Sequence, residues 1–364
     1  MSSQIPNPKP GIMDITPYVG GKSTSTGTGR VAKLSSNETP LGTSPKAQAA
    51  LDGIVAKLHL YPDGGSGALK EAIAEIHKVN PAQIICGNGS DEILSLIANA
   101  YAGPGDEVLF SVHGFLVYEL AALANGATPV KAPEKNLTTD VDALLSLVTD
   151  KTKILFLANP NNPTGTYIPF SEVERLHAGL RGDILLVLDA AYAEYVEKSD
   201  YEAGASLVAR SKNVIMTRTF SKIFGLSALR IGWGYGSDEV IDVLNRIRGP
   251  FNVNAVAQIT AIEAVHDQDF VRKAVEHNRK WIPILTQRMR GMGLLIPDSV
   301  GNFILMDFSE TGKSALDAEA FLSARGLILR NIASYGLPNC LRMSVGTDDD
   351  NRDVIDALTE FLGQ

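Results

Sequence analysis

Five short apolar runs, separated by segments with helical periodicity, limit how this chain can fold more than any other feature. They cover residues 83–86, 107–111, 153–158, 183–188 and 213–217. Continuous apolar runs of this length are typical of strands that are buried on both faces of a sheet. Helical patterns lie between the runs, at residues 91–101, 116–124 and 171–180. We therefore expect an α/β fold with a large, mostly parallel sheet covered by helices on both faces.

The pattern changes near residue 270. Strand-like runs at 303–307, 327–330 and 341–345 then mix with helical patterns at 315–325 and 352–362, which predicts a small α+β domain. The long helical pattern at 270–292 contains Pro283, so we expect a kink or break there. The first 30 residues are rich in Pro, Gly, Ser and Thr and resemble an arm that packs against the second domain. The predicted division is an N-terminal arm with a small-domain segment (1–44), a large domain (45–270) and a small C-terminal domain (271–364).

Composition excludes several classes of protein. The chain has 364 residues and a formal net charge of −8, and it lacks the clustered basic residues that nucleic-acid binding requires. Its two cysteines, Cys86 and Cys340, suit neither a disulfide framework nor a zinc site, and we expect no metal. No apolar run has the length of a signal peptide core or a membrane span. We therefore expect a cytoplasmic protein.

Ligands bind beyond the carboxyl ends of the strands in an open parallel sheet, so the residues after each run are candidate site residues. After the first run, Gly89, Ser90 and Asp91 lead into a helix, whose N-terminal N–H groups favour an anion. After the second run, Phe115 could stack on a planar ring, while His113 is more often a structural residue at such a position. Alternatively, the Gly89–Asp91 segment is only a turn with a helix cap, and Phe115 is only a core aromatic residue.

The last three runs are followed by more specific side chains. The third leads into Asn159-Pro-Asn-Asn-Pro-Thr-Gly165, a stiff loop rich in amides. Asp189 ends the fourth, where a partly buried carboxylate needs a cationic partner such as a pyridinium nitrogen, unless it only caps a helix. After the fifth come Thr219, Ser221 and Lys222, whose amine can attack a carbonyl if its pKa is lowered. A lysine beside a phosphate clamp is what pyridoxal phosphate (PLP) requires, although a surface lysine would also suit a polar loop.

Taken together, these motifs resemble those of the fold-type I PLP-dependent aminotransferases of class I and II over almost the whole chain. The resemblance rests on the Asn-Pro-Thr-Gly segment ending at Gly165, the Asp189-x-x-Tyr192 pair, and Lys222 with Arg230. Within that family the chain is most similar to the histidinol-phosphate aminotransferases, at residues 15–18, 36–42, 61–63, 89–92, 335–338 and 341–347. It departs from the usual pattern at Ala190, at His113 and in the turn 331–334 near the substrate pocket. It also resembles a subgroup that accepts aromatic amino acids.

The resemblance implies a role for each candidate residue. Lys222, Asp189 and Tyr192 are the expected catalytic residues: Lys222 binds PLP covalently and moves a proton, and Asp189 keeps the pyridine nitrogen protonated. Tyr192 and Asn162 contact the 3-oxygen of the PLP ring, and Phe115 stacks on it. The remaining expected cofactor-binding residues surround the phosphate: Gly89, Ser90, Asp91, Thr219, Ser221, Arg230 and, from the other subunit of a homodimer, Tyr61.

The resemblance also implies the substrates. Arg342 would bind the α-carboxylate of glutamate, while Arg330 and Tyr18, with Asn37 nearby, would bind the phosphate of a second substrate. The expected reaction is transfer of the amino group of L-histidinol phosphate to 2-oxoglutarate, which forms imidazole acetol phosphate and glutamate in histidine biosynthesis. The alternatives are an aromatic amino acid (Phe/Tyr) aminotransferase, a PLP-dependent amino-acid phosphate decarboxylase, and a non-catalytic ligand sensor with the same fold.

Overall fold

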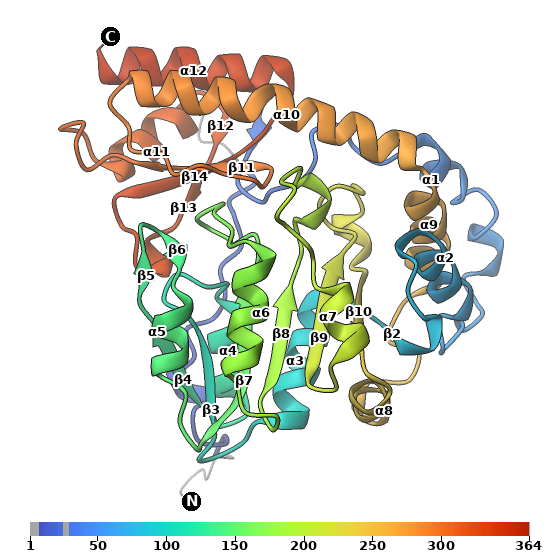
Figure 1. Cartoon of the computed structure of the whole chain (residues 1–364). Coiled ribbons are helices and arrows are strands. Elements are labelled where there is room, and N and C mark those ends of the chain that lie inside the picture. Colours follow the sequence, from blue (N-terminus) through green and yellow to red (C-terminus); the bar gives the residue numbers. More distant parts are fainter. Residues whose placement is uncertain (1–6, 25–28, 364) are drawn as a thin grey trace, which may run out of the picture.

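A seven-stranded sheet forms the centre of the larger part of the molecule (Figure 1). The computed structural model describes residues 7–24 and 29–363. The strand order is β2 (Ile84–Gly87), β10 (Gly232–Gly236), β9 (Val214–Thr219), β8 (Leu185–Asp189), β7 (Thr152–Ala158), β3 (Glu107–Ser111) and β4 (Thr128–Ala132). Neighbouring strands are parallel except for β10, which is antiparallel to both β2 and β9.

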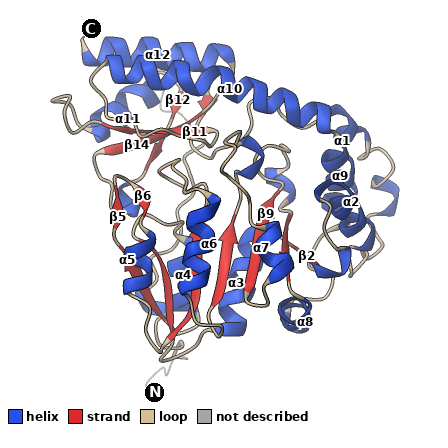
Figure 2. Ribbon diagram, viewed as in Figure 1, coloured by secondary structure: helices blue, strands red, loops and turns tan. Residues whose placement is uncertain are grey.

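Both faces of this sheet are apolar, as the continuous runs predict. Every residue of β8 and β9 is buried. Successive side chains of a strand point to opposite faces, so Leu186 and Leu188 belong to one core cluster while Leu185 and Val187 belong to the other. One face packs against α2 (Gly67–His77), α5 (Val141–Ser146), α6 (Phe170–Gly179), α7 (Ala205–Arg210) and α9 (Ala255–His266). The other packs against α3 (Ser90–Tyr101), α4 (Val117–Ala124) and α8 (Asp238–Ile247), so that the sheet is enclosed by helices (Figure 2).

A second, smaller sheet lies above the carboxyl ends of the central strands (Figure 1). It is antiparallel, with the order β11 (Phe303–Asp307), β14 (Cys340–Ser344) and β13 (Arg330–Asn331). Its apolar core includes residues of α10 (Gln268–Gly291), α11 (Ala315–Ala324) and α12 (Asp348–Leu362). The predicted α/β fold with a smaller α+β part is confirmed.

The N-terminal segment packs against this C-terminal part of the chain. The short strand β1 (Ala32–Lys33) pairs with β12 (Leu327–Ile328), and Lys22 forms an ion pair with Glu319. Residues 1–6 and 25–28 of the predicted arm lie outside the described residues. The domain bounds at 44 and 270 stay a prediction.

The remaining elements are short. They are α1 (Pro45–Ala49), the hairpin β5 (Glu134–Lys135) and β6 (Thr138–Thr139), and the 3₁₀ turns η1 (Ile12–Asp14), η2 (Val55–Lys57), η3 (Pro81–Gln83), η4 (Ala193–Tyr195), η5 (Ser227–Leu229) and η6 (Ala333–Tyr335). Within residues 7–24 and 29–363, no helix has both the length and the apolar character needed to cross a membrane.

Several elements differ from the sequence-based expectations. The run predicted as one strand at 327–330 is divided between β12 and β13, which belong to different sheets. The strands β10 and β4 were not predicted, since β10 reads Gly-Trp-Gly-Tyr-Gly and β4 contains a proline. The glycine at 232 has a structural reason, because a Cβ atom there would lie 2.3 Å from the backbone nitrogen of Ser90. A kink or break was predicted at Pro283. The break is wrong, because α10 continues through this residue, and the kink stays a prediction. Proline removes one backbone hydrogen bond, and the buried side chains of Trp281 and Leu285 on either side keep the helix against the core.

Candidate active site

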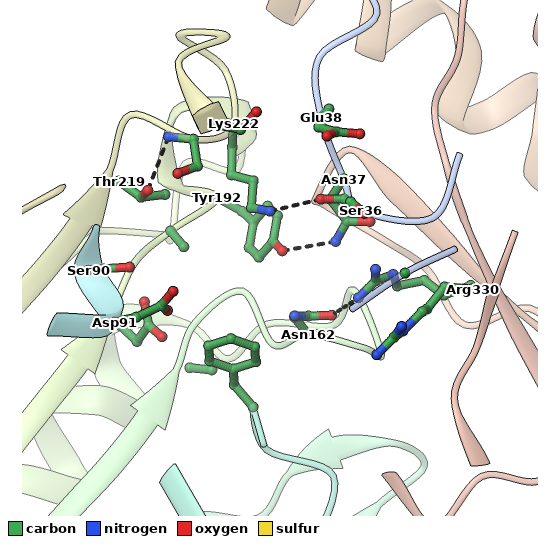
Figure 3. Close-up of a pocket in the computed structure, with 18 of the residues that line it drawn as sticks. Ser36, Asn37, Glu38, Ser90, Asp91, Asn162, Tyr192, Thr219, Lys222 and Arg330 are labelled. Atoms are coloured by element: carbon green, nitrogen blue, oxygen red, sulfur yellow. Dashed lines mark hydrogen bonds between the residues drawn. The ribbon is translucent and has the colours of Figure 1, made fainter. Parts of the chain in front are cut away.

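A cavity of about 240 Å³ lies between the carboxyl ends of the central strands and the small sheet. Its volume is near the lower end of the range for small-molecule sites, which is about 300–1,000 Å³. All the predicted site residues except Gly89 and Tyr61 line it: Tyr18, Asn37, Ser90, Asp91, Phe115, Asn162, Asp189, Tyr192, Thr219, Ser221, Lys222, Arg230, Arg330 and Arg342. Those labelled in Figure 3 come from strand ends, loops, the start of α3 and the N-terminal segment.

Asp189 supplies a buried carboxylate. It is the last residue of β8, and its Oδ2 accepts a hydrogen bond of 2.7 Å from the phenol of Tyr118, while Oδ1 accepts a longer one of 3.4 Å from Thr217. Burial raises the pKa of Asp189 to about 6, although the two hydroxyl donors act in the opposite direction. Among the described residues, no cationic side chain forms an ion pair with it. This carboxylate is therefore suited to a cationic group of a ligand.

Lys222 supplies an amine with a lowered pKa. It follows β9 within the loop that begins at Phe220, and its Nζ donates a hydrogen bond of 2.9 Å to the backbone oxygen of Ser36 (Figure 3). Burial lowers the pKa of Lys222 to about 8, and the positive charge of Arg342 adds to the effect. More of this amine than of an ordinary lysine is therefore uncharged near neutral pH, which favours its use as a nucleophile and base.

Hydroxyl and guanidinium donors gather at the N-terminus of α3. Arg230 donates to Ser221 Oγ at 3.2 Å and forms an ion pair of 3.0 Å with Asp91. Ser90 is the first residue of α3, and its N-cap, Gly89, offers no side-chain oxygen. The uncapped N–H groups, the hydroxyls and Arg230 form a site suited to a phosphate.

Gly89 does not line the cavity, but it shapes this phosphate-like site. Its φ angle is 83°, and a Cβ atom added there would lie 2.6 Å from Nη2 of Arg230. A side chain at this position would therefore displace the guanidinium, which explains why glycine is needed.

The two predicted substrate arginines lie side by side on adjacent strands of the small sheet. Arg330 of β13 is in direct register with Arg342 of β14. Arg342 is buried and donates to the carbonyl of Ser35 at 2.8 Å and to Oδ1 of Asn162. Its buried Nε atom has no hydrogen-bond partner, and no carboxylate of residues 7–24 or 29–363 forms an ion pair with it. An anionic ligand would satisfy it.

Arg330 contacts the N-terminal segment. Its Nη2 donates to the carbonyl of Val19 at 2.7 Å, and its guanidinium carbon lies 5.9 Å from the ring centroid of Tyr18. Tyr18 is about half exposed, at 51%. The N-terminal segment therefore forms one wall of the cavity beside the arginine pair.

Tyr192 is joined to the same segment. Asn37, which has a φ angle of 56°, donates from Nδ2 to the phenol oxygen of Tyr192 at 2.9 Å. Burial raises the pKa of Tyr192 to about 12, so it stays protonated at neutral pH and can donate a hydrogen bond into the cavity.

Sequence reasoning missed part of the wall around Asn37. Ser35, Ser36 and Glu38 also line the cavity, and so does Tyr335. The contact of Ser36 with Lys222 uses a backbone carbonyl, which no pattern of side chains reveals. The only sequence signal for this segment was the family resemblance at residues 36–42.

Besides Gly89, two more candidates lie outside the cavity. The side chain of Tyr61 is 82% exposed and stacks on Phe251, with ring centroids 4.7 Å apart. The ring of His113 makes a hydrogen bond of 2.9 Å with Glu134 and does not line the cavity. This contact agrees with the structural interpretation of His113.

Comparison with known proteins agrees with the family resemblance found in the sequence. The sequence profile of the family "Aminotransferase class I and II" matches residues 30–358. A histidinol-phosphate aminotransferase of Rhodopseudomonas palustris (strain HaA2) is 56% identical over 99% of both chains, and one of Rhodospirillum centenum is 52% identical over 100% of this chain and 99% of its own. A crystal structure of the histidinol-phosphate aminotransferase of Sinorhizobium meliloti in complex with pyridoxal-5'-phosphate superposes with a TM-score of 0.88. It is 27% identical and the alignment covers 100% of this chain and 98% of that one.

Proposed function

The chain belongs to the class I and II aminotransferase family, and we propose that it transfers the amino group of L-histidinol phosphate to 2-oxoglutarate with PLP as cofactor. The observation that carries this proposal is the arginine pair. Arg342 and Arg330 lie side by side in register, opposite Lys222 across the cavity. The two anionic substrates, a phosphate monoester and a dicarboxylate, need two cationic contacts at one site. The full-length relatives named for this activity support the same reaction.

The residues of the cavity fit PLP. Asp189, a buried carboxylate with no cationic partner among residues 7–24 and 29–363, suits the ring nitrogen. The hydroxyls with Arg230 at the start of α3 suit the phosphate. When bound, PLP supplies an aldehyde that takes up the substrate amino group and a ring that withdraws electrons from the reacting bond. Phe115 would pack on the ring face, and Tyr192 and Asn162 would contact its 3-oxygen.

Lys222 is the acid–base residue of the proposed reaction. Its amine would hold the cofactor covalently and, once displaced by the substrate amine, would move a proton between the substrate α-carbon and C4′ of the cofactor. A base with a pKa near 8 is matched to proton transfer at neutral pH. Arg342 orients the α-carboxylate of glutamate, and Arg330 with Tyr18 binds the phosphate of histidinol phosphate. Asn37 positions Tyr192.

A panel of amine donors with 2-oxoglutarate, measured on the wild type and on Arg330→Ala, tests the proposal. Histidinol phosphate should be the best donor of the wild type. Loss of a charge-assisted contact costs on the order of 2–5 kcal/mol, so Arg330→Ala should lower kcat/KM for histidinol phosphate by roughly a few hundred-fold at about 1.4 kcal/mol per decade. Phenylalanine, which has no phosphate, should lose much less.

The control variant is Arg325→Ala, because Arg325 is paired with Glu360 away from the cavity and should leave both donors unaffected. Equal losses on both donors in Arg330→Ala would assign Arg330 to a shared carboxylate contact instead. A wild type that prefers phenylalanine would be an aromatic amino acid aminotransferase. Release of carbon dioxide without a keto acid would identify a decarboxylase.

We also propose that the protein is a cytoplasmic homodimer. Large apolar side chains are exposed around Tyr61: Leu58 is 62% exposed, Leu60 58% and Phe251 44%. Exposed apolar groups that lie close together are typical of an interface between proteins. A second copy of the chain would cover them, and Tyr61 would donate its hydroxyl to the cofactor phosphate of that copy.

Mixed dimers test the shared site. When a Lys222→Ala chain is paired with a Tyr61→Phe chain at limiting PLP, one site should carry both lesions and the other none. The activity per dimer should then be about half that of the wild type, because one of the two sites is intact. If Tyr61 serves its own subunit, activity should stay far below half until the PLP concentration is raised. A monomer in solution would also contradict the proposal.

A further inference from the structure

Tyr118 lies behind the cavity, yet its phenol contacts the carboxylate at the cavity wall. Its side chain is fully buried and does not line the cavity. The phenol donates to Oδ2 of Asp189 at 2.7 Å, whereas the only other side-chain donor to this carboxylate among the described residues is Thr217, at 3.4 Å from Oδ1. The shorter hydrogen bond is the one from Tyr118, which is therefore the dominant polar contact of this carboxylate.

The ring of Tyr118 is held rigidly. It stacks on Phe156 with centroids 4.6 Å apart and planes 3° apart, and it meets Phe110 edge to face at 5.9 Å. Phe115, which lines the cavity, also contacts it edge to face at 6.0 Å. A phenol packed in this way has little freedom to turn its oxygen away from Asp189. The same rigid aromatic cluster thus supports the cavity residue Phe115 and the carboxylate.

The hydrogen bond has a fixed direction. Burial and the neighbouring charge of Asp189 raise the pKa of Tyr118 well above its ordinary value. The phenol therefore stays protonated and is the donor of the hydrogen bond to Asp189. The groups around the carboxylate are Tyr118 from α4, Thr217 from β9, and Asp91 from α3, whose negative charge disfavours ionisation of Asp189. The two hydroxyls and the backbone N–H of Ala191 oppose this effect and that of burial. Donation to an ionised acceptor stabilises the negative charge.

We propose that Tyr118 is a positioning residue for Asp189: its phenol orients the carboxylate and stabilises its negative charge, so that Asp189 can keep the cofactor ring nitrogen protonated. This inference rests on the proposed function, because it needs PLP in the cavity. Without the phenol, the carboxylate becomes a stronger base. The proton between Asp189 and the ring nitrogen would then lie more often on the carboxylate and less often on the nitrogen.

The test compares Tyr118→Phe with the wild type, both loaded with PLP that carries ¹⁵N in its ring. The ¹⁵N chemical shift reports directly whether the ring nitrogen is protonated. In Tyr118→Phe the signal should move towards the unprotonated value. The amino-transfer half-reaction should slow by about tenfold or more, as expected for the loss of a hydrogen bond to a charged group.

The matched control is Tyr235→Phe. Tyr235 is also a buried tyrosine of the central sheet region, and its phenol makes a hydrogen bond of 3.2 Å with Gln83, away from the cavity. This variant should lose a comparable contact while the ring signal and the half-reaction stay as in the wild type. If Tyr118→Phe folds poorly, Thr217→Val removes the longer donor with little change in shape and should shift the ring signal in the same direction by a smaller amount.

A wild-type ring signal in Tyr118→Phe would overturn the inference, even if the half-reaction slows, because Tyr118 would then act through packing alone. Where Thr217→Val replaces that variant, a wild-type ring signal would overturn the inference because hydroxyl donors to Asp189 would then not influence the protonation of the ring nitrogen. A wild-type protein that does not bind the labelled PLP would overturn the proposed function itself, and the inference with it. The two failures are therefore distinguishable.

Discussion

Lys222→Ala should have no measurable amino transfer, while the protein still folds and still binds PLP weakly through its phosphate. The reason is that the same amine holds the cofactor and moves the substrate proton, and no other described lysine lines the cavity. Reduction with borohydride followed by mass spectrometry should find the cofactor attached to the wild-type chain, at Lys222, and not to the variant. The wild type should also be yellow as purified, and the variant should not.

The pH dependence of cofactor uptake gives a second measure of Lys222. Only the uncharged amine attacks an aldehyde, and burial lowers the pKa of Lys222 to about 8. The rate at which cofactor-free protein takes up PLP covalently should therefore rise between pH 7 and 9, with a midpoint near 8. Lys212→Ala is the control, because Lys212 is exposed and paired with Glu239. Normal turnover of Lys222→Ala would show that another residue is the base.

The position of the site followed from the sequence because two independent physical rules apply at the same residues. Buried parallel strands require continuous apolar runs, and the carboxyl ends of such strands gather at one edge of the sheet. Asp189 and Lys222 could therefore be expected to lie together although 33 residues separate them. The structure places both in one cavity. Their individual roles stay predictions, which the substitutions at these positions test.

Other features depend on contacts that leave no local signal. The strand β10 carries three glycines and has low strand propensity, yet it pairs with both β2 and β9. The glycine at 232 is required because the closely packed start of α3 leaves no room for a Cβ there. The acceptor for Lys222 is a backbone carbonyl, and the donor to Asp189 is a tyrosine 71 residues away that sequence reasoning could interpret as a core aromatic residue. Such long-range partners become visible only when the chain is folded.

The small sheet could be predicted from the sequence only in part. Strands were expected at 327–330 and 341–345, and the second is observed as β14, whereas the first is divided so that Arg330 begins the separate strand β13. The register shows that Arg330 and Arg342 are directly opposite each other. The contrast between them is a consequence of burial: Arg342 is 5% exposed and has its Nε unsatisfied, whereas Arg330 extends towards the N-terminal segment. This contrast favours different anions for the two side chains.

Asp189→Ala should slow the amino-transfer half-reaction by at least about thirtyfold, because removing one partner of a buried charge pair costs on the order of 2–5 kcal/mol, at about 1.4 kcal/mol per decade. Without the carboxylate the ring nitrogen would lose its proton and withdraw electrons poorly. Single-turnover mixing with histidinol phosphate, followed by the absorbance of the cofactor, measures this step without interference from product release. Asp189→Glu should recover part of the rate, and near-wild-type rates in Asp189→Ala would remove Asp189 from this role.

Measurements of the free energy of unfolding show whether Asp189 has a structural role in addition to its proposed catalytic one. In the cofactor-free protein, burial raises the pKa of Asp189 to about 6, so the native state holds a proton more tightly than the unfolded state does. The contribution of Asp189 to the free energy of unfolding is therefore most favourable at low pH, falls as pH rises through about 4–6, and is constant above that range. Asp189→Asn, which keeps the shape and an acceptor for Tyr118, should lose this pH-dependent contribution and be at least as stable as the wild type at pH 7–8. Chemical denaturation of both cofactor-free proteins from pH 4 to 8 measures the difference. An Asn variant that is much less stable at pH 7–8 would instead assign Asp189 a structural role.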